Sequence, residues 1–420
     1  MKALQKMIGN IEVTKDLMIL LIIGGLYALS IALSNTFVNV FLWKQSGEFI
    51  DIAIYNLSIV LFQPITFIFA GRLAKRIDRV IVLRLGVISL SIFYLTVLLL
   101  GAQAEQFLIL LGGLLGIGMG FYWLAFNVLT FEITEPDTRD FFNGFLGLLT
   151  SFAGMVGPFF AGWIITKMDK MIGYKTIFAI SLILFFAAVI MSFMLNRRTA
   201  KGIFSFVRII KERKKNPNWN RILYAHFFQG LREGTFIFVI VVWVFIATNS
   251  ELALGTYGLI NSAVSFIAYY VATRYIKTAQ RKKAILVGGI ILYAALVLIV
   301  FELTFAKLLT YGVIISIAYP ILLVPYVSLT YDVIGRSWNA REMRIEYIVV
   351  RELYLNYGRI TSIVLFIIAI TLFDEQKSIP YLLPIIGIGH SLIYFCVRKI
   401  RLAPVPEETV VLSNENGSNV

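Results

Sequence analysis

The chain has 420 residues, of which 59% are hydrophobic and only 15% are charged. Soluble domains average about 45–50% apolar and about 25% charged residues, so this composition excludes an ordinary soluble globule, a disordered chain and a coiled coil. A single cysteine, Cys396, excludes an internal disulfide framework and a zinc site built from several cysteines. We therefore expect neither a metal nor a cofactor.

The net charge of +14 would indicate nucleic acid in a soluble protein. In a membrane protein the positive charge comes from Lys and Arg residues that collect in cytoplasmic loops, so we expect no nucleic-acid partner.

Twelve apolar runs are each long enough to cross a bilayer core about 30 Å thick, which needs about 20 residues per helix. They predict an all-α polytopic membrane protein with twelve transmembrane helices. The even number of helices places both termini on one side of the membrane. The runs span residues 17–41, 52–71, 80–101, 107–130, 141–166, 174–195, 222–247, 253–273, 284–302, 307–330, 346–373 and 379–397.

Lys and Arg are distributed unevenly between the two sets of loops. With the N-terminus placed inside, 29 of them fall in inside segments and six in outside loops. Because cytoplasmic loops collect Lys and Arg, this distribution predicts a multi-pass protein of the cell (plasma) membrane with both termini in the cytoplasm. The same positive charges are expected to contact the anionic lipids of the inner leaflet.

The longest polar stretch, 196–221, divides the runs into two sets of six. It predicts an N-terminal six-helix bundle over 1–196, a basic cytoplasmic linker over 197–221 and a C-terminal six-helix bundle over 222–402. The polar, acidic segment 403–420 is predicted to be a disordered cytoplasmic tail.

Short sequence elements recur between the two halves at a nearly constant offset. Leu129–Ile133 recurs as Leu329–Val333 at a shift of 200, and Arg79 recurs as Arg281 at a shift of 202. This common shift, matched to the six-plus-six layout, indicates a parallel repeat of two pseudo-symmetric bundles. Transporters of that architecture bind substrate between the halves, near the membrane midplane.

The loop between the second and third runs reads GRLAKRIDRV over 71–80. It resembles the Gly-x-Leu-Ala-Asp-Arg-x-Gly-Arg-Arg motif of the major facilitator superfamily, which the topology also resembles along nearly the whole chain. In that family the aspartate helps to latch the two halves, but here Lys75 replaces it and Asp78 replaces the second glycine. The resemblance implies a cytoplasmic gate, and it leaves open whether the latch is retained through Asp78. The candidate gating residues are Gly71, Arg72, Arg76, Asp78, Arg79, Glu132 and Asp332.

A second element lies in the fifth run and reads GMVGPFFAG over 154–162. It resembles the Gly-x-x-x-Gly-Pro-x-x-x-Gly element of drug/proton antiporters in the same superfamily. Its key residues are Gly154, Gly157, Pro158 and Gly162. Small residues at this spacing also allow two helices to approach closely, so plain helix packing is the alternative interpretation.

The seventh run carries Gln229, Arg232 and Glu233. A charge at the bilayer centre costs about 2.5–3.5 kcal/mol on insertion scales, so charges at this depth are candidate functional groups. Neighbouring residues of a helix point about 100° apart. Arg232 and Glu233 therefore cannot form one simple internal pair, and at least one should meet another helix or a central cavity.

The eleventh run carries Arg351, Glu352, Asn356 and Arg359. Glu352, Asn356 and Arg359 are spaced i, i+4 and i+7 and share one helix face. Two buried arginines suit a wet cavity that binds an anionic substrate or a phosphate headgroup, because guanidinium binds oxyanions in a bidentate fashion. A structural Arg–Glu network that locks the C-terminal half is the alternative.

The N-terminal half offers amides and a tyrosine in place of charges. The candidates for the other wall of the cavity are Asn35, Asn39, Gln63, Tyr122, Asn127 and Asn143. Glu132 and Asp332 end the fourth and tenth runs at repeat-related positions. Because helix C-termini disfavour anions, we expect these carboxylates to pair with cytoplasmic arginines such as Arg72 or Arg274.

The sequence contains no Gly-x-x-x-x-Gly-Lys-Ser/Thr nucleotide loop, which argues against an ATP-driven pump. It also shows no nucleophile–base arrangement, so we do not expect an enzyme. We predict a monomeric secondary transporter that works by alternating access and is coupled to protons through Glu233 and Glu352. Its substrate is expected to be a small amphipathic or anionic solute, with an exporting antiporter favoured. A flippase for a lipid or lipid-linked headgroup and a non-transporting membrane partner of the same fold remain as alternatives.

Overall fold

The computed structural model describes residues 14–133, 136–197 and 202–402, and all regular secondary structure in these segments is helical. Eleven helical stretches within them are long and apolar enough to cross a membrane. One stretch, 79–130, contains two helices separated by the short 3₁₀ helix η1 (Gly101–Phe107), so the stretches amount to the twelve predicted spans. The predicted tail over 403–420 lies outside the described residues.

Six spans form each half of the chain. The N-terminal half contains α2 (Lys15–Ser46), α3 (Phe49–Arg76), α4 (Arg79–Leu100), α5 (Leu108–Ile133), α6 (Pro136–Lys167) and α7 (Lys170–Phe193). The C-terminal half contains α9 (Pro217–Thr248), α10 (Glu251–Tyr275), η2 (Thr278–Gln280), α11 (Arg281–Ala294) with α12 (Val297–Val300), α13 (Phe305–Gly335), α14 (Arg344–Leu372), and α15 (Glu375–Gly387) with α16 (Gly389–Val397). A further short helix, α8 (Phe206–Glu212), lies within the predicted linker.

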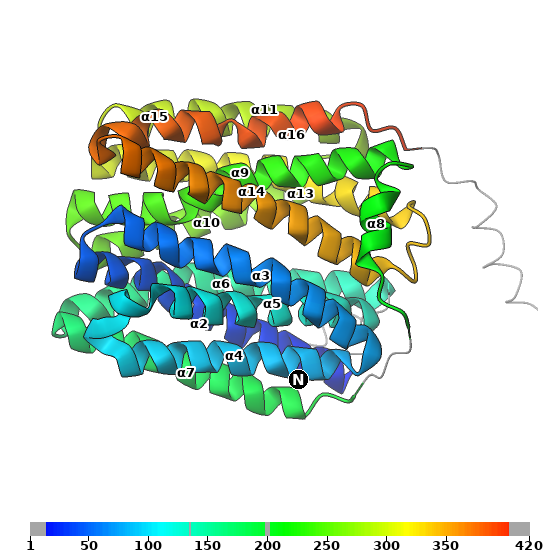
Figure 1. Cartoon of the computed structure of the whole chain (residues 1–420), viewed down its shortest axis with the longest axis horizontal. Helices are drawn as coiled ribbons and strands as arrows, with labels where there is room; N and C mark the ends of the chain where they lie inside the picture. The colour runs from blue at the N-terminus through cyan, green and yellow to red at the C-terminus, as the bar shows by residue number, and fades with distance from the viewer. Residues whose placement is uncertain (1–13, 134–135, 198–201, 403–420) are drawn as a thin grey trace, which may run out of the picture.

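The two halves lie side by side, with the C-terminal half above the N-terminal half in Figure 1. Helix α8 crosses one end of the bundle from one half toward the other, and this end is called the linker end below; the opposite end is called the far end. The described chain starts at α2 and finishes after α16, and both of these points lie at the linker end. An even number of spans requires this arrangement.

Helix α9 begins five residues before the apolar run predicted from 222, because a strong capping sequence precedes that run. The Asn216 side chain accepts hydrogen bonds from the backbone N–H groups of Asn218 and Trp219, at 3.1 Å each. Pro217 occupies the first helical turn, where its fixed φ fits and its missing N–H costs nothing. Residues 217–221, predicted as the end of the linker, therefore belong to α9.

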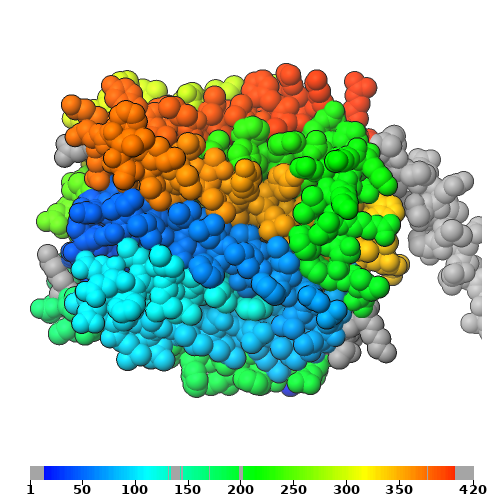
Figure 2. Space-filling view, in the orientation of Figure 1, coloured from blue at the N-terminus to red at the C-terminus, as the bar shows by residue number. Residues whose placement is uncertain are grey.

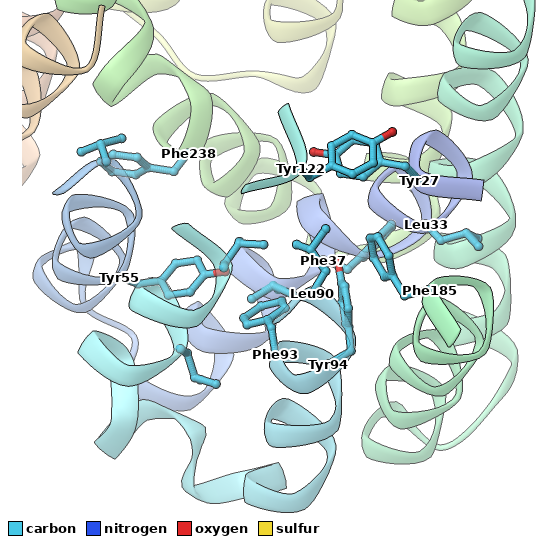
Figure 3. Close-up of a cluster of buried hydrophobic side chains, with 14 of the residues drawn as sticks. Tyr27, Leu33, Phe37, Tyr55, Leu90, Phe93, Tyr94, Tyr122, Phe185 and Phe238 are labelled. Carbon is cyan, nitrogen blue, oxygen red and sulfur yellow. The ribbon is translucent and has the colours of Figure 1, made fainter. Parts of the chain in front are cut away.

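Aromatic side chains fill the interior of the N-terminal half (Figure 3). Tyr27 of α2 stacks on Tyr122 of α5, with 3.8 Å between ring centroids and 4° between ring planes. Tyr94 of α4 stacks against Phe185 of α7 at 5.5 Å, and its hydroxyl is hydrogen-bonded to Ser34. Packed aromatic rings bury much apolar surface and contact one another closely, which favours such clusters in an apolar interior. Tyr122 therefore belongs to this aromatic core and not to a substrate-facing wall.

Among the described residues, the most extensive contacts between the halves along their seam are those of α3 with α14 and of α6 with α10. Figure 2 shows α3 in direct contact with α14 across the visible face. In the second pair, a Cβ atom added at Gly162 would lie 2.3 Å from the carbonyl oxygen of Glu251, and one at Gly255 would lie 2.4 Å from that of Pro158. Side chains at these glycines would push α6 and α10 apart.

The remaining glycines of the motif in α6 also lie at close helix contacts. A Cβ at Gly154 would meet Ser262 of α10 at 3.0 Å, and one at Gly157 would meet Ala32 of α2 at 2.8 Å. The motif therefore occupies the junction of α6 with α2 and α10. These contacts are the close helix approaches that the packing interpretation expects, and those of Gly154 and Gly162 with α10 lie at the seam between the halves.

Helices α9 and α14 approach each other through two reciprocal glycines. A Cβ at Gly230 of α9 would lie 1.9 Å from the carbonyl oxygen of Leu355, and one at Gly358 of α14 would lie 2.0 Å from that of Phe227. The backbones are in direct contact at both points. This contact matters for function because the charged residues of the two helices lie beside it.

We expect Gly358→Ala to lower the thermal unfolding midpoint of the purified protein, because the added methyl group overpacks a backbone contact, at a cost of about 1–3 kcal/mol. The matched control is Gly147→Ala in α6, where an added Cβ would have no neighbour within 4 Å. This control should leave the midpoint unchanged or slightly raised, since alanine favours helices over glycine. Equal midpoints for the two variants would contradict the described packing of α9 on α14.

Candidate functional site

A central cavity with a volume of 530 Å³ is bounded by both halves of the chain. Helices α2, α3 and α5 form one wall and helices α9, α13 and α14 form the other. This size falls in the range of small-molecule sites, about 300–1,000 Å³. Because its walls come from both halves, the cavity lies where the six-plus-six repeat predicts a substrate site.

Amides form the polar part of the N-terminal wall. Asn35, Asn39, Gln63 and Asn127 line the cavity, as the sequence predicted, and Asn56 joins them. The amide nitrogen of Asn56 donates to the side-chain oxygen of Asn39 at 2.8 Å, which fixes the orientation of both groups. The side chain of Asn143 is outside the described part of the structure. This wall offers neutral donors and acceptors to a ligand.

The C-terminal wall is charged, and its centre is an ion pair between helices. Arg359 of α14 approaches Glu233 of α9 at 2.7 Å. The second oxygen of Glu233 accepts hydrogen bonds from Gln229 at 2.8 Å and from the hydroxyl of Tyr319 at 2.9 Å. The carboxylate is thus held by one cation and two neutral donors from three helices. Such full satisfaction is what makes a charge tolerable in an apolar bundle.

Arg351 and Glu352 of α14 form a second ion pair in the same wall, at 2.7 Å. Arg351 also donates to the hydroxyl of Tyr331 at 3.4 Å. Both members of the pair line the central cavity. The C-terminal half therefore combines the two alternatives considered from sequence: an Arg–Glu network is formed, and the same network lines a cavity.

Two of the predicted cavity residues lie elsewhere. Asn356 is fully buried, its amide donates to the carbonyl of Glu352 at 3.0 Å, and it is absent from the described lining of the central cavity. Arg232 points away from that cavity because it follows the helix face about 100° from Glu233. It donates to the hydroxyl of Tyr311 in α13 at 3.1 Å. Asn356 shares a helix face with Glu352 and Arg359, but only the latter two line the central cavity.

Arg232 lines a second cavity, called the side chamber below, which has a volume of 550 Å³ and lies within the C-terminal half. Gln229, Glu233, Ile237 and Arg359 line both the side chamber and the central cavity. The ion pair between Glu233 and Arg359 therefore stands at the common wall of the two spaces. The other polar groups of the chamber come from Tyr311, Tyr319, His390, Ser265 and Ser316.

At the linker end, the seam is joined by Lys75 of α3 and Glu346 of α14. The Lys75 ammonium lies 2.5 Å from the Glu346 carboxylate and donates to the carbonyl of Glu342 at 3.0 Å. Both side chains are almost fully buried. Lys75 stands where the superfamily motif has its aspartate. At this position the chain therefore contacts the other half through a positive side chain in place of a negative one. Asp78 instead caps α4, accepting from the backbone N–H of Val80 at 2.7 Å.

At the far end, the seam is joined by Lys44 of α2 and Glu251 of α10, at 2.5 Å. The hydroxyl of Tyr174 in α7 donates to the same carboxylate at 3.2 Å. The sequence analysis did not identify this contact. Each end of the seam thus carries an ion pair between the halves, with the central cavity between them; the pair at the linker end is buried, whereas at the far end Glu251 is buried and Lys44 is exposed.

The carboxylates at the ends of α5 and α13 pair with arginines, but with partners different from those expected. Glu132 binds Arg79 at 2.8 Å and Asp332 binds Arg281 at 2.6 Å, in place of Arg72 and Arg274. The two observed pairs are related by the sequence repeat, since each arginine starts the helix after the repeated loop. The pairs lie within each half and not across the seam.

The other residues of the loop motif lie around the same end. Gly71 allows close contact with Phe204 and Val349, because a Cβ atom there would lie 2.7 Å and 3.2 Å from them. Arg72 and Arg76 line a groove beneath the segment 202–207 that leads into α8. The motif thus packs α3 against the linker and against the C-terminal half.

Some residues that line the central cavity or the side chamber were not predicted from the sequence, among them Asn56, His226 and Tyr319. Asn56 precedes Gln63 by seven residues, so both share one face of α3, and this spacing was a usable signal. His226 lines the cavity beside Tyr326, whose hydroxyl lies 2.6 Å from its ring nitrogen. A lone histidine or tyrosine in an apolar run carries no such pattern, so the sequence did not distinguish these side chains from core residues.

The fold, the cavity between the halves and the charged wall define a polytopic membrane transporter. A family model described as Major Facilitator Superfamily matches residues 18–343. The chain belongs to this superfamily, as the loop motif and the topology indicated.

Comparison with known proteins identifies similar chains. The uncharacterized protein YqgE of Bacillus subtilis (strain 168) is 62% identical over 420 residues, covering 100% of this chain and 98% of that protein. An uncharacterized protein in the sodM 3′ region of Geobacillus stearothermophilus is 63% identical over 174 residues, covering 41% of this chain and 81% of that protein. The crystal structure of the human organic anion transporter MFSD10 (TETRAN) has a TM-score of 0.61 at 14% identity, covering 91% of this chain and 98% of that one. At this identity the likeness shows a common fold.

The buried pair at the linker end gives a double-mutant prediction. Lys75→Glu should lower the thermal midpoint strongly, because breaking a buried ion pair and leaving a charge unpaired costs about 3–5 kcal/mol. Adding Glu346→Lys should recover part of that loss by restoring opposite charges, and the cycle gives the coupling energy.

The same reversal at Arg281 and Asp332, which are more exposed, serves as the control. It should cost less, because solvent screens the exposed pair. A double reversal of Lys75 and Glu346 that is no more stable than Lys75→Glu alone would show that the contact does not join the halves.

Proposed function

We propose that the chain is a secondary active transporter that works by alternating access, with the central cavity as its substrate site. The observation that carries the proposal is a charged cavity shared by both halves, with an ion pair across the seam at each end. Rocking of the halves would break Lys75–Glu346 to open the linker end and Lys44–Glu251 to open the far end. These two contacts are the proposed gates.

The proposed substrate is a small amphipathic or anionic solute. The C-terminal wall places the guanidinium groups of Arg351 and Arg359 on the cavity, and the opposite wall offers amides. MFSD10, which shares the fold, is described as an organic anion transporter. Export is the favoured direction, because the glycine motif in α6 resembles that of drug/proton antiporters.

Proton coupling is proposed at Glu233 and Glu352, the two carboxylates that line the central cavity and pair with arginine. An anionic substrate that binds Arg359 competes with Glu233 for that cation. A carboxylate that loses its counter-charge in an apolar site takes up a proton more readily. Substrate binding and proton binding would then be linked through one arginine.

The proposed location is the plasma membrane, with the linker end in the cytoplasm and the chain acting as a monomer. The excess of Lys and Arg in the segments on that side supports this orientation. The basic groups there are also proposed to contact anionic lipids of the inner leaflet.

Specific observations favour this transporter over the two alternatives. A scaffold protein would have its charges paired and its cavity filled, whereas the charges here are paired around a cavity of 530 Å³. A flippase needs a lateral opening between the halves. The close contact of Gly162 with the backbone at Glu251, and of Gly71 with Val349, instead indicates tight packing on both flanks of the seam.

Proton coupling is tested in proteoliposomes by measuring accumulation of amphipathic anions, with naphthalene-1-sulfonate as the first probe, under an imposed pH gradient. We expect Glu233→Gln or Glu352→Gln to abolish the accumulation driven by pH while leaving exchange of internal for external probe. The amide keeps the shape of the carboxylate but cannot take up a proton. If both variants retained full pH-driven accumulation, these carboxylates would not carry the proton.

The gates are tested with one cysteine reporter. Val327 lines the central cavity, so Val327→Cys in a Cys396→Ser background reports access of a membrane-impermeant maleimide. Lys75→Ala should increase labelling from the linker side only, and Lys44→Ala from the far side only, as measured in vesicles of each orientation. The parent without gate substitutions is the control. An increase from the same side in both variants would refute the assignment of two gates.

A further inference from the structure

The three arginines that line the cavities of the C-terminal half, Arg232, Arg351 and Arg359, differ in how their charge is balanced. Arg359 and Arg351 have carboxylate partners at 2.7 Å. For Arg232, no carboxylate of the described residues lies within ion-pair distance. Its guanidinium is held only by the hydroxyl of Tyr311 at 3.1 Å and by the ring of Phe236, whose centroid is 4.6 Å away.

This lack of a counter-ion is costly, because Arg232 is only 5% exposed and the bundle lies in an apolar medium. Its Nε atom is buried and has no hydrogen-bond partner among the described residues. A buried charge without an anion is destabilising, and a single phenol and an aromatic ring compensate only part of that cost. The arginine thus contributes little to folding, and it presents an unused positive charge to the side chamber.

His390 adds a second unsatisfied polar group to the same space. Its ring is fully buried, and neither ring nitrogen has a partner among the described residues. Gly389, the preceding residue, allows α16 to touch α9, since a Cβ there would lie 2.3 Å from the carbonyl of Phe228 and 3.2 Å from the nitrogen of Arg232. This contact brings His390 and Arg232 to the same chamber. A neutral imidazole keeps one N–H that can donate to an oxyanion.

The remaining lining of the side chamber is mostly apolar. It comes from Phe236, Ile237, Ile240, Val241, Leu292 and Ile315. A chamber of 550 Å³ with one uncompensated cation at its polar side fits a ligand with one anionic group and an apolar body. A strongly charged solute, such as a polyphosphate, would lack further cations because Arg359 is already paired.

We propose that the side chamber is the binding site for the anionic group of an amphipathic mono-anion, with Arg232 as its counter-ion and Tyr311 and His390 as hydrogen-bond donors. The inference deepens the proposed function, on which it rests for the transport of this ligand. Because Glu233 and Arg359 form the common wall, a ligand in the chamber lies directly beside the proposed proton-coupling pair.

Binding is tested on the purified full chain with two probes of similar shape, naphthalene-1-sulfonate and the uncharged naphthalene-1-sulfonamide. We expect the sulfonate to bind at least about tenfold tighter, as an ionic hydrogen bond predicts. Arg232→Gln should remove this preference while leaving sulfonamide binding unchanged, and Arg232→Lys should retain part of it. Methanesulfonate, which lacks the apolar body, should bind far more weakly than naphthalene-1-sulfonate.

The ligand-free proteins supply an independent readout. Arg232→Gln should keep or raise the thermal midpoint, because it removes a charge that has no anion, and Arg359→Gln should lower it, because it strands Glu233. A destabilised Arg232→Gln protein that still preferred the sulfonate would overturn the proposal. Loss of the preference in Asn35→Ala but not in Arg232→Gln would also overturn it, because the ligand would then lie in the central cavity.

Transport of the probes separates this inference from the proposed function. If the sulfonate binds through Arg232 but no flux is seen in proteoliposomes, the site stands and the transporter proposal fails. If flux of the sulfonate is retained at the wild-type rate in Arg232→Gln, the transporter stands and the side-chamber site is refuted.

Discussion

The ion pair between Glu233 and Arg359 is the contact around which the C-terminal half is organised. It joins α9 to α14 inside an apolar bundle, where an isolated charge would be costly. Gly230 and Gly358 bring the two backbones into contact and so let the side chains reach each other. The pair also separates the central cavity from the side chamber. The same two side chains therefore stabilise the half and face both cavities.

Much of the fold followed from the sequence because the signals are local. Hydropathy predicted the twelve spans, and several helices extend past the apolar runs into polar residues, as α9 does at its Asn216–Pro217 cap and α3 does to Arg76. The repeat offset predicted the two-half arrangement. The angular offset between neighbours on a helix predicted that Arg232 and Glu233 do not form one simple internal pair and that at least one meets another helix or the cavity; in the structure Arg232 contacts Tyr311 and Glu233 pairs with Arg359.

The site was less predictable, because its contacts join segments far apart in the sequence. Lys75 and Glu346 are separated by 271 positions, and no local pattern shows that a lysine in a motif position meets a glutamate in another half. The partners of Glu132 and Asp332 depend on how α4 and α11 start beside the ends of α5 and α13. The side chamber depends on helix tilt and on the close approach at Gly389, which a helical projection cannot give.

The ion pairs at the two ends of the seam have a kinetic consequence. Both are formed at once, so in the proposed alternating-access mechanism one of them dissociates each time the cavity opens toward its end. Dissociation at the linker end exposes Lys75 and Glu346, which are both buried, whereas at the far end Lys44 is already exposed and only Glu251 is buried. Hydration of the separated charges offsets part of the lost attraction. In that proposed mechanism the turnover number depends on how often each end opens, and unequal strengths of the two ion pairs would set which side the resting protein faces.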